Sequence, residues 1–202
     1  MIEQYQKLVR EHFKKELMIN DDAHGLEHCD AVLRKMYRVK KHFNLVVNEK
    51  LMIMAAYIHD LKCHESREHH HTLSAEWVKN NADKDFFLMD LSTKEIVELY
   101  TAISEHRSRL NCGLTNTLSV VLNTADKDEP RLDLILYRSL QYNNDPLRVY
   151  EHIIDKYSRK GYIKYTKWYI DFYGKESLEK LYSDIDKLTI EDVIKFKEEH
   201  NM

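Results

Sequence analysis

Apolar residues recur every three or four positions along most of this chain, a spacing that places them on one face of an α-helix. The segment at 48–60 differs, because it is apolar nearly all round, and it is expected at the centre of a core. The helices predicted for the first two thirds cover residues 2–17, 26–43, 48–60, a segment starting near Leu73, 93–109 and 115–127.

Turn-forming residues are scarce: the 202 residues include four glycines and two prolines. A sheet protein of this size needs turn residues at every eighth to twelfth position or so. Long helices joined by short polar connections fit this composition better. The sequence therefore predicts an all-α fold.

Two breaks divide the chain after its last strongly apolar helix. Pro130 follows the polar stretch 127–129, and a second break lies at 143–146. The remainder, 147–200, is charged, helical in pattern and interrupted near Gly161 and Gly174. We predict a core domain over residues 1–130 and a helical C-terminal extension over 131–202 that packs on it.

Charge and cysteine content narrow the function classes. The formal net charge is −3, with charges of both signs mixed along the chain, which argues against a nucleic-acid platform and against a polybasic membrane binder. Cys29, Cys63 and Cys112 are far apart and odd in number, as is typical of reduced thiols. No apolar run approaches the length of a membrane span or a signal-peptide core, so a cytoplasmic location is expected.

Several ionisable residues extend the apolar faces of predicted helices instead of lying opposite them. An unpaired buried carboxylate costs several kcal/mol, so such groups are normally paired, neutral or bound to metal. Imidazoles and carboxylates from different helices of a bundle make a plausible shell for a divalent cation. The residues concerned are His28, His59, Asp60, His106 and Asp126.

Each of these residues also has a simpler interpretation. A single histidine on an apolar face is more often a hydrogen-bonded core residue, and Asp60 alone could cap the next turn. The occurrence of such residues on the apolar faces of four predicted helices favours a metal site over these separate explanations. Within the triplet 69–71 we favour His70 as the residue that points inward, with His71 as the alternative, and we rank His24 lower as a ligand.

The ordered set of four residues resembles the HD-domain metal-dependent phosphohydrolases. The match consists of His28 in HGLEHCDAVLRKMYRV, His59 and Asp60 in MAAYIHDLK, and Asp126 in VLNTADKDEP, and it covers about residues 20–130. The resemblance implies an HD-type helical bundle in which these four side chains bind one divalent ion. Some family members bind two metals, and His70 and His106 fall where the additional ligands would lie.

The reaction implied by the resemblance is hydrolysis of a phosphate ester or anhydride by metal-activated water. The substrate would be a nucleotide or related phosphorylated metabolite, and the enzyme a phosphomonoesterase, phosphodiesterase or nucleotidase. Mn, Fe, Co, Ni, Zn and Mg all remain candidates, as one ion or two. We expect Asp60 to orient the ion and accept the proton of the nucleophile. The cations expected to offset phosphate charge are Lys62 and Arg107, with Arg109 and Lys127 as further candidates.

Two readings from other classes stay open. A degenerate HD module would bind a nucleotide as a sensor without cleaving it. A helical interaction protein would use the tyrosine-rich segment 137–173 as a partner surface. The oligomeric state is also open, a homodimer being one alternative, and a nucleic-acid partner is the least favoured reading.

Overall fold

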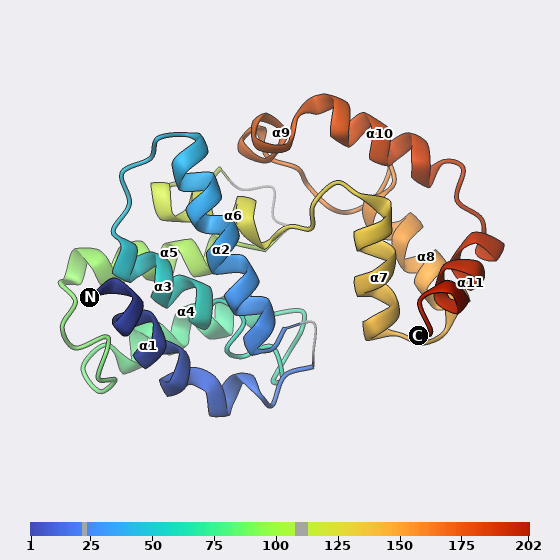
Figure 1. The fold of residues 1–202 in the computed structure, drawn as a ribbon. Coiled ribbons are helices and arrows are strands. Elements are labelled where there is room, and N and C mark those ends of the chain that lie inside the picture. The colour runs from blue at the N-terminus through green and yellow to red at the C-terminus, as the bar shows by residue number, and fades with distance from the viewer. Residues whose placement is uncertain (22–23, 108–112) are drawn as a thin grey trace. The chain divides into compact units, whose positions relative to one another are not determined.

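The fold of the chain, seen in a computed structural model, is helical as the sequence predicts (Figure 1). The structure describes residues 1–21, 24–107 and 113–202, and these residues form eleven helices and no strand. The chain divides into two compact units, Met1–Asp126 and Lys127–Met202. We expected the boundary after residue 130.

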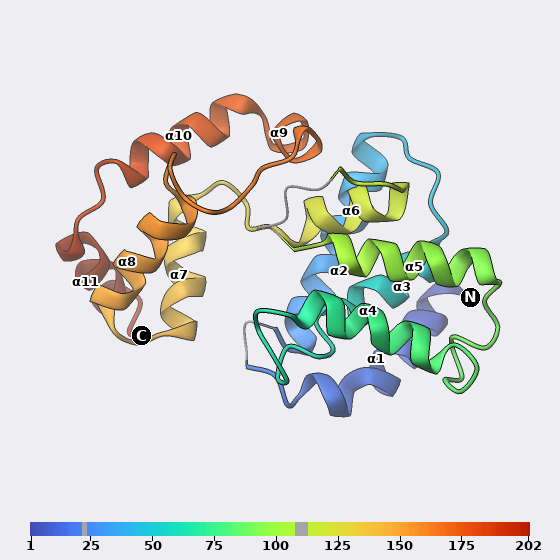
Figure 2. The same cartoon turned by 180° about the vertical axis from the view of Figure 1, so that it is seen from behind.

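The first unit is built around α3, the helix that the sequence marks as apolar on all sides. Every residue of α3 from Leu51 to Ile58 is buried. Helices α1, α2, α5 and α6 all pack against α3, and α4 lies alongside α5 (Figures 1 and 2). The helices of this unit are α1 (Ile2–Leu17), α2 (Leu26–His42), α3 (Glu49–Ile58), α4 (His70–Asn81), α5 (Thr93–Glu105) and α6 (Thr117–Asp126).

Helix α4 begins three residues before the position expected from the sequence, at His70 instead of Leu73. The chain can turn there because the Ser66 hydroxyl accepts a hydrogen bond from the backbone N–H of His69, the N-cap residue. The apolar pattern could not reveal this start, since the first residues of the helix are polar histidines. His70 therefore lies in the first turn of α4.

A buried network ties α1, α2 and α3 together. The Asp30 carboxylate of α2 accepts a hydrogen bond of 2.6 Å from the Tyr57 hydroxyl of α3. It also accepts bonds of 3.1 Å from Nε of Arg10 on α1. Asp30 lies two residues after His28, and Tyr57 lies two residues before His59. This network therefore fixes the two helices that carry the first two predicted ligands.

The second unit has its own core, in which α8 packs against α7, α10 and α11. Asp128 organises one side, because its carboxylate accepts hydrogen bonds from Tyr157 and from Arg138. Gly174 has a φ of +86°, a value that favours glycine, and it separates α9 from α10 as expected. The helices of this unit are α7 (Leu132–Tyr142), α8 (Pro146–Tyr157), α9 (Lys167–Tyr173), α10 (Lys175–Ile185) and α11 (Ile190–Glu199).

One helix boundary in this unit was not anticipated. The helical pattern runs on past Gly174, but α10 ends at Ile185 and α11 begins at Ile190. Thr189 starts the new helix with a capping box, in which its hydroxyl and the Asp192 carboxylate each bond the other residue's backbone N–H. This threonine and aspartate three residues apart are the sequence feature that marks the break.

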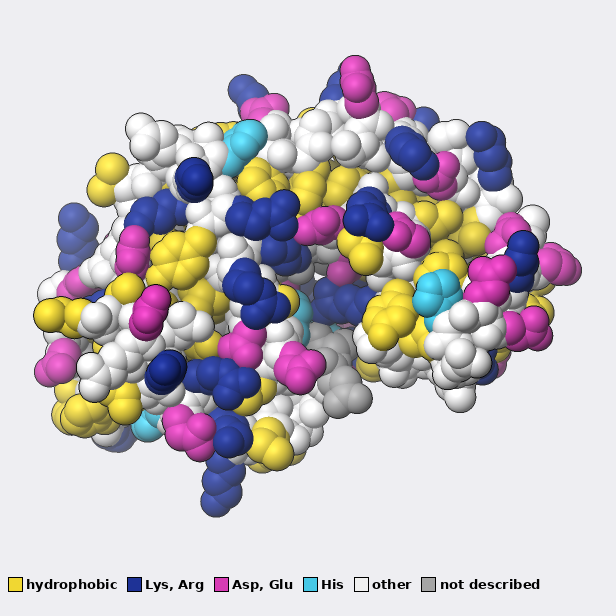
Figure 3. Space-filling view, viewed as in Figure 1, with side chains coloured by type: hydrophobic (Ala, Val, Ile, Leu, Met, Phe, Trp, Pro, Cys, Tyr) yellow, Lys and Arg dark blue, Asp and Glu magenta, His cyan; other side chains and the backbone are white. Residues whose placement is uncertain are grey.

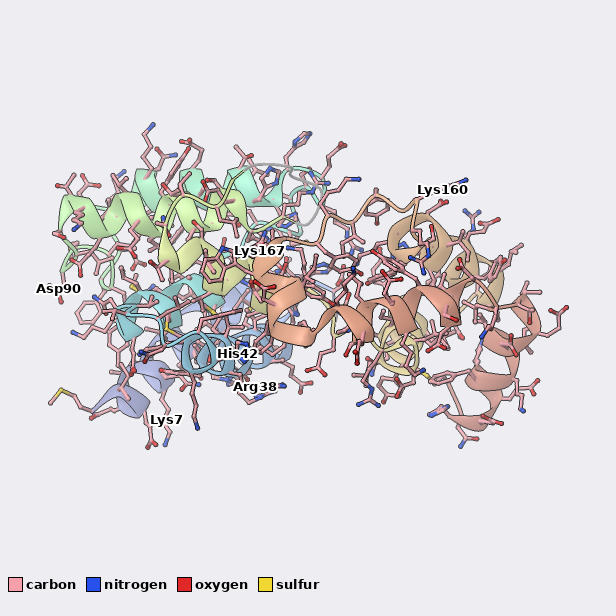
Figure 4. All side chains as sticks on the ribbon, turned by 90° about the horizontal axis from the view of Figure 1, so that it is seen from above. Lys7, Arg38, His42, Asp90, Lys160 and Lys167 are labelled. Atoms are coloured by element: carbon pink, nitrogen blue, oxygen red, sulfur yellow. The ribbon has the colours of Figure 1, made fainter. Side chains whose placement is uncertain are left out.

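Charged side chains occupy the outer faces, as the amphipathic pattern requires. Lys7 on α1 and Arg38 and His42 on α2 are exposed and extend from the ribbon (Figure 4). On the face drawn in Figure 3, acidic and basic side chains are intermixed. Within the described part of the chain, every helix is too short or too polar to cross a lipid bilayer.

The Asp30 network gives a stability prediction. Removing the Tyr57 hydroxyl with Tyr57→Phe leaves a partly buried carboxylate without one donor, which we expect to lower the free energy of unfolding by about 1.5–3 kcal/mol. Urea denaturation monitored by circular dichroism measures the change. Tyr100→Phe is the matched control, because the Tyr100 hydroxyl donates to the more exposed carboxylate of Glu76. Equal losses in the two variants would contradict a special role for Asp30.

Candidate metal centre

The predicted ligands lie at the ends of five helices of the first unit. Helix ends carry unpaired backbone groups, and the partial negative charge of a C-terminal end favours a nearby cation. Three of the five ends are C-terminal. His28 lies in the first turn of α2, His70 begins α4, His59 and His106 are the C-cap residues of α3 and α5, Asp60 follows His59, and Asp126 ends α6.

The first ligand set combines His28, His59, Asp60 and Asp126. His28 Nε2 lies 3.2 Å from Asp126 Oδ1, 3.4 Å from Asp60 Oδ2 and 3.3 Å from His59 Nε2. His59 Nε2 lies 3.3 Å from Asp60 Oδ2 and 3.6 Å from Asp126 Oδ1. Ligand atoms held about 2.0–2.2 Å from one divalent ion are roughly 3.0–3.6 Å from each other. Each of these five distances therefore lies in the range expected between two ligands of one divalent ion, and His28, His59 and Asp60 together have the spacing of a metal site.

The second ligand set shares Asp60 with the first. Asp60 Oδ1 lies 3.2 Å from His70 Nε2 and 3.5 Å from His106 Nε2. The two imidazole nitrogens are 3.1 Å apart. Since Asp60 Oδ2 faces His28 and His59, the two oxygens of one carboxylate face different sets. This arrangement suits a carboxylate that bridges two cations. His70 is the residue of the triplet that faces Asp60, while His71 is buried elsewhere in the core.

Backbone carbonyls fix the tautomers of three of these histidines. A neutral ring whose Nδ1 donates to a carbonyl carries its proton there, so Nε2 is left with a lone pair for a metal. In each case the carbonyl belongs to the residue three positions earlier. The pairs are His59 Nδ1 with the Ala56 carbonyl at 3.0 Å, His70 Nδ1 with that of Arg67 at 2.8 Å, and His106 Nδ1 with that of Ile103 at 2.6 Å.

This protonation pattern fits a cation. With Nδ1 protonated, the Nε2 atoms of His70 and His106 are both acceptors, yet they face each other at 3.1 Å. Two lone pairs at that distance repel each other unless a positive charge lies between or beside them. The donor set of imidazole nitrogens and carboxylate oxygens suits Mn, Fe, Co, Ni or Zn, and less so Mg, which favours oxygen ligands.

Burial differs between the two ends of the cluster. The side chains of His59, Asp60 and His106 are 0%, 3% and 1% exposed. Asp126 is 20% exposed and His70 is 12% exposed. A substrate would therefore reach the cluster at Asp126 or at His70, while the Asp60 carboxylate stays shielded from water.

The electrostatic coupling within the cluster is strong. Burial opposes charge on both carboxylates, but the neighbouring histidines hold the pKa values of Asp60 and Asp126 well below their usual range. Burial also opposes charge on His59, yet Asp60 and Asp126 raise the pKa of its imidazole to about 10. Burial lowers the pKa of His70 to about 4. The first set thus holds a proton where a cation would otherwise bind, whereas His70 is neutral at neutral pH.

Comparison of the chain with protein-family models, with curated proteins and with solved structures finds no match in any of the three. The geometry and chemistry of the cluster are therefore the basis for assigning a function.

The predicted phosphate-binding cations have other partners in the structure. The Lys62 ammonium contacts the carboxylates of Glu16 and Glu65, and the latter distance is 3.0 Å. Arg107 follows His106 in the sequence, and its guanidinium donates a hydrogen bond to the backbone carbonyl of Glu68. Arg109 and Cys112 lie outside the described residues, and Lys127 is the first residue of the second unit.

The thiols beside the cluster have no place in its chemistry. Cys29 and Cys63 are buried free cysteines, as expected of core residues. Burial raises the pKa of both thiols, that of Cys63 to about 12, so both stay protonated at neutral pH. The side chains that could hold a metal ion are the histidines and aspartates.

Sequence reasoning considered His24 as a ligand but missed Asp21 and Arg67, which form a polar group with it beside the first ligand set. His24 Nδ1 lies 2.7 Å from Asp21 Oδ1, and Arg67 contacts both residues, at 3.3 Å from Asp21 and 3.4 Å from His24. The His24 ring lies 6.0 Å from the ring of His28, measured between centroids. Arg67 lies in a connection without apolar periodicity, so no pattern in the sequence points to it.

The pKa values give a prediction for metal binding. A cation can occupy the first set only when the proton on His59 leaves, so we expect about one proton to be released per first cation bound at pH 7. The affinity should rise roughly tenfold per pH unit between pH 6 and 9, since this range lies below the pKa of about 10. Calorimetric titration with Mn²⁺ in two buffers of different ionisation enthalpy counts the protons. A pH-independent affinity with no proton release would contradict the coupling described here.

Proposed function

We propose that this chain is a metal-dependent phosphohydrolase of the HD type that binds two divalent cations bridged by Asp60. One observation carries the proposal: the two oxygens of the buried Asp60 carboxylate each face a separate pair of imidazoles. Divalent pairs bridged in this way are suited to hydrolysis of phosphate esters and anhydrides. A nucleotide or related phosphorylated metabolite is the proposed substrate class.

The roles of the residues follow from their placement. A divalent cation lowers the pKa of water toward neutrality and so supplies a nucleophile. Asp60 would hold the cations together with the imidazoles that face it, and its carboxylate is only 3% exposed. Asp126 is the more exposed of the two carboxylates, which makes it better suited than Asp60 to take a proton from the attacking water. This differs from the sequence-based expectation, which gave the proton to Asp60.

Arg67 is the cation we assign to the substrate phosphate. Its side chain is 45% exposed and its guanidinium is positioned by Asp21 and His24, while its backbone carbonyl orients His70. An arginine in this position can contact a phosphate oxygen while keeping a bond to Asp21, because the guanidinium offers five N–H donors. Lys62 and Arg107 stay as sequence-based candidates for the same task.

Substitution of the bridging residue tests the function. Asp60→Ala removes the one carboxylate common to both sets, so we expect loss of both bound cations and a decrease of at least about 10³-fold in the kcat for an aryl phosphate ester. Metal content by mass spectrometry and release of the aryl alcohol are measured on the same sample, with Mn²⁺ and then Zn²⁺ supplied.

His69→Ala is the matched control, because His69 belongs to the same histidine triplet but is exposed and outside both ligand sets. This variant should keep the metal content and the activity of the unaltered protein. Full activity in Asp60→Ala would refute the proposal. Tight nucleotide binding without turnover by the metal-loaded protein would favour a sensor instead.

The assignment of Arg67 predicts a specific kinetic change. Arg67→Ala should raise the KM for the aryl phosphate by about 10- to 100-fold, the value of one hydrogen bond between charged groups, without lowering the metal content. Arg67→Lys should recover part of the loss. Arg159→Ala serves as the control, since Arg159 is similarly exposed and is paired with Glu179 in the second unit. A KM unchanged in Arg67→Ala would remove Arg67 from the substrate site.

A further inference from the structure

A buried amide links the ends of the helices that bear Asp126 and His106. Asn123 lies on α6, three residues before Asp126, and its side chain is almost fully inside the protein. Its Nδ2 donates to the backbone carbonyl of Glu105 at 3.1 Å and to that of His106 at 3.0 Å. These carbonyls lie at the C-terminal end of α5, where the last backbone acceptors have no partner within the helix.

From this geometry we infer that Asn123 is a positioning residue that builds the second ligand set by holding His106 in place. The inference rests on the proposed function, in that it requires a cation bound between Asp60, His70 and His106. Asn123 contributes no ligand atom to either set. It acts through the backbone of His106.

The orientation of the His106 ring depends on two constraints. The first is local: Nδ1 bonds the Ile103 carbonyl at 2.6 Å, which fixes the ring relative to the last turn of α5. The second is the position of that turn in the protein, which the Asn123 amide sets by holding the carbonyls of Glu105 and His106. Loss of the second constraint would leave the ring correctly turned on a helix end that is free to shift.

The first ligand set does not depend on this link. His28, His59 and Asp60 come from α2 and from the end of α3, and Asp30 and Tyr57 hold those helices together. Asp126 shares α6 with Asn123, but α6 also packs against α2 and α3, which support its position without the amide. A substitution at Asn123 should therefore weaken the second cation selectively. Removing a partner outside the ligand shell typically costs 10- to 100-fold in metal affinity.

The chain supplies a matched control in Asn116. Its Nδ2 donates to the Glu98 carbonyl at 3.2 Å, and its Oδ1 accepts a bond of 2.7 Å from the backbone N–H of Ser119. This asparagine therefore makes the same type of link between the α6 region and α5, but far along α5 from His106. A general weakening of the contact between these helices would affect both variants. A positioning role would affect only one.

The experiment compares Asn123→Leu with Asn116→Leu, each with the number and branching of its side-chain heavy atoms retained and its amide removed. The probe is Mn²⁺ alone, titrated by calorimetry, with electron paramagnetic resonance to detect the spin coupling of a bridged Mn²⁺ pair. We expect Asn123→Leu to bind one Mn²⁺ as the unaltered protein does, to bind the second 10- to 100-fold more weakly, and to lose the coupled signal at equal Mn²⁺. Asn116→Leu should bind both and keep the signal.

Several outcomes overturn the inference. Two normal binding events in Asn123→Leu would show that the amide does not position His106. Equal loss of the second event in both variants would assign the effect to helix packing. If the unaltered protein bound a single Mn²⁺ or none, the paired-cation function would itself be wrong, which separates the two failures. Should Asn123→Leu not fold, as judged by circular dichroism, Asn123→Ser takes its place, since a hydroxyl is too short to reach both carbonyls.

Discussion

The first unit depends on the compensation of one buried charge, the carboxylate of Asp60, by the imidazoles around it. This carboxylate is almost completely buried, it faces imidazoles on both of its oxygens, and it follows directly on the most buried helix of the protein. A carboxylate in such a place is unfavourable unless positive charge compensates it, because burial removes its hydration. The histidines gathered around it provide that compensation as protons or as ligands of a cation. The same requirement explains why five helix ends meet at one point.

Much of this organisation could be read from the sequence, and the reason is periodicity. The helices of the first unit follow apolar stripes, and His28, His59, Asp60, His106 and Asp126 were found because each extends such a stripe. Buried polar residues that continue an apolar face can be recognised from the sequence alone, by their spacing. The HD-type bundle and the enzymatic activity, by contrast, are still proposals, since the helical class alone does not specify either.

Other features could not be predicted because they arise from contacts between distant segments. Nothing in the sequence around Arg67 indicates that its guanidinium reaches Asp21 and His24. The pairing of Lys62 with Glu16 depends on the distance between a loop and α1, which no local pattern contains. Asn123 looked like part of an apolar helix, and only the fold shows that its amide meets the end of α5. Loops and side-chain amides thus account for most of what the sequence concealed.

The bonds from imidazole Nδ1 to a carbonyl three residues earlier have a consequence for how this site can vary. The acceptor is main chain in every case, at Ala56, Arg67 and Ile103, so the orientation of each ring does not depend on the side chain at the accepting position. The residues at those positions can be substituted while the imidazole rings keep their orientation. A site built in this way tolerates many substitutions around its ligands. Its geometry can therefore persist in a sequence whose surrounding residues have diverged beyond recognition.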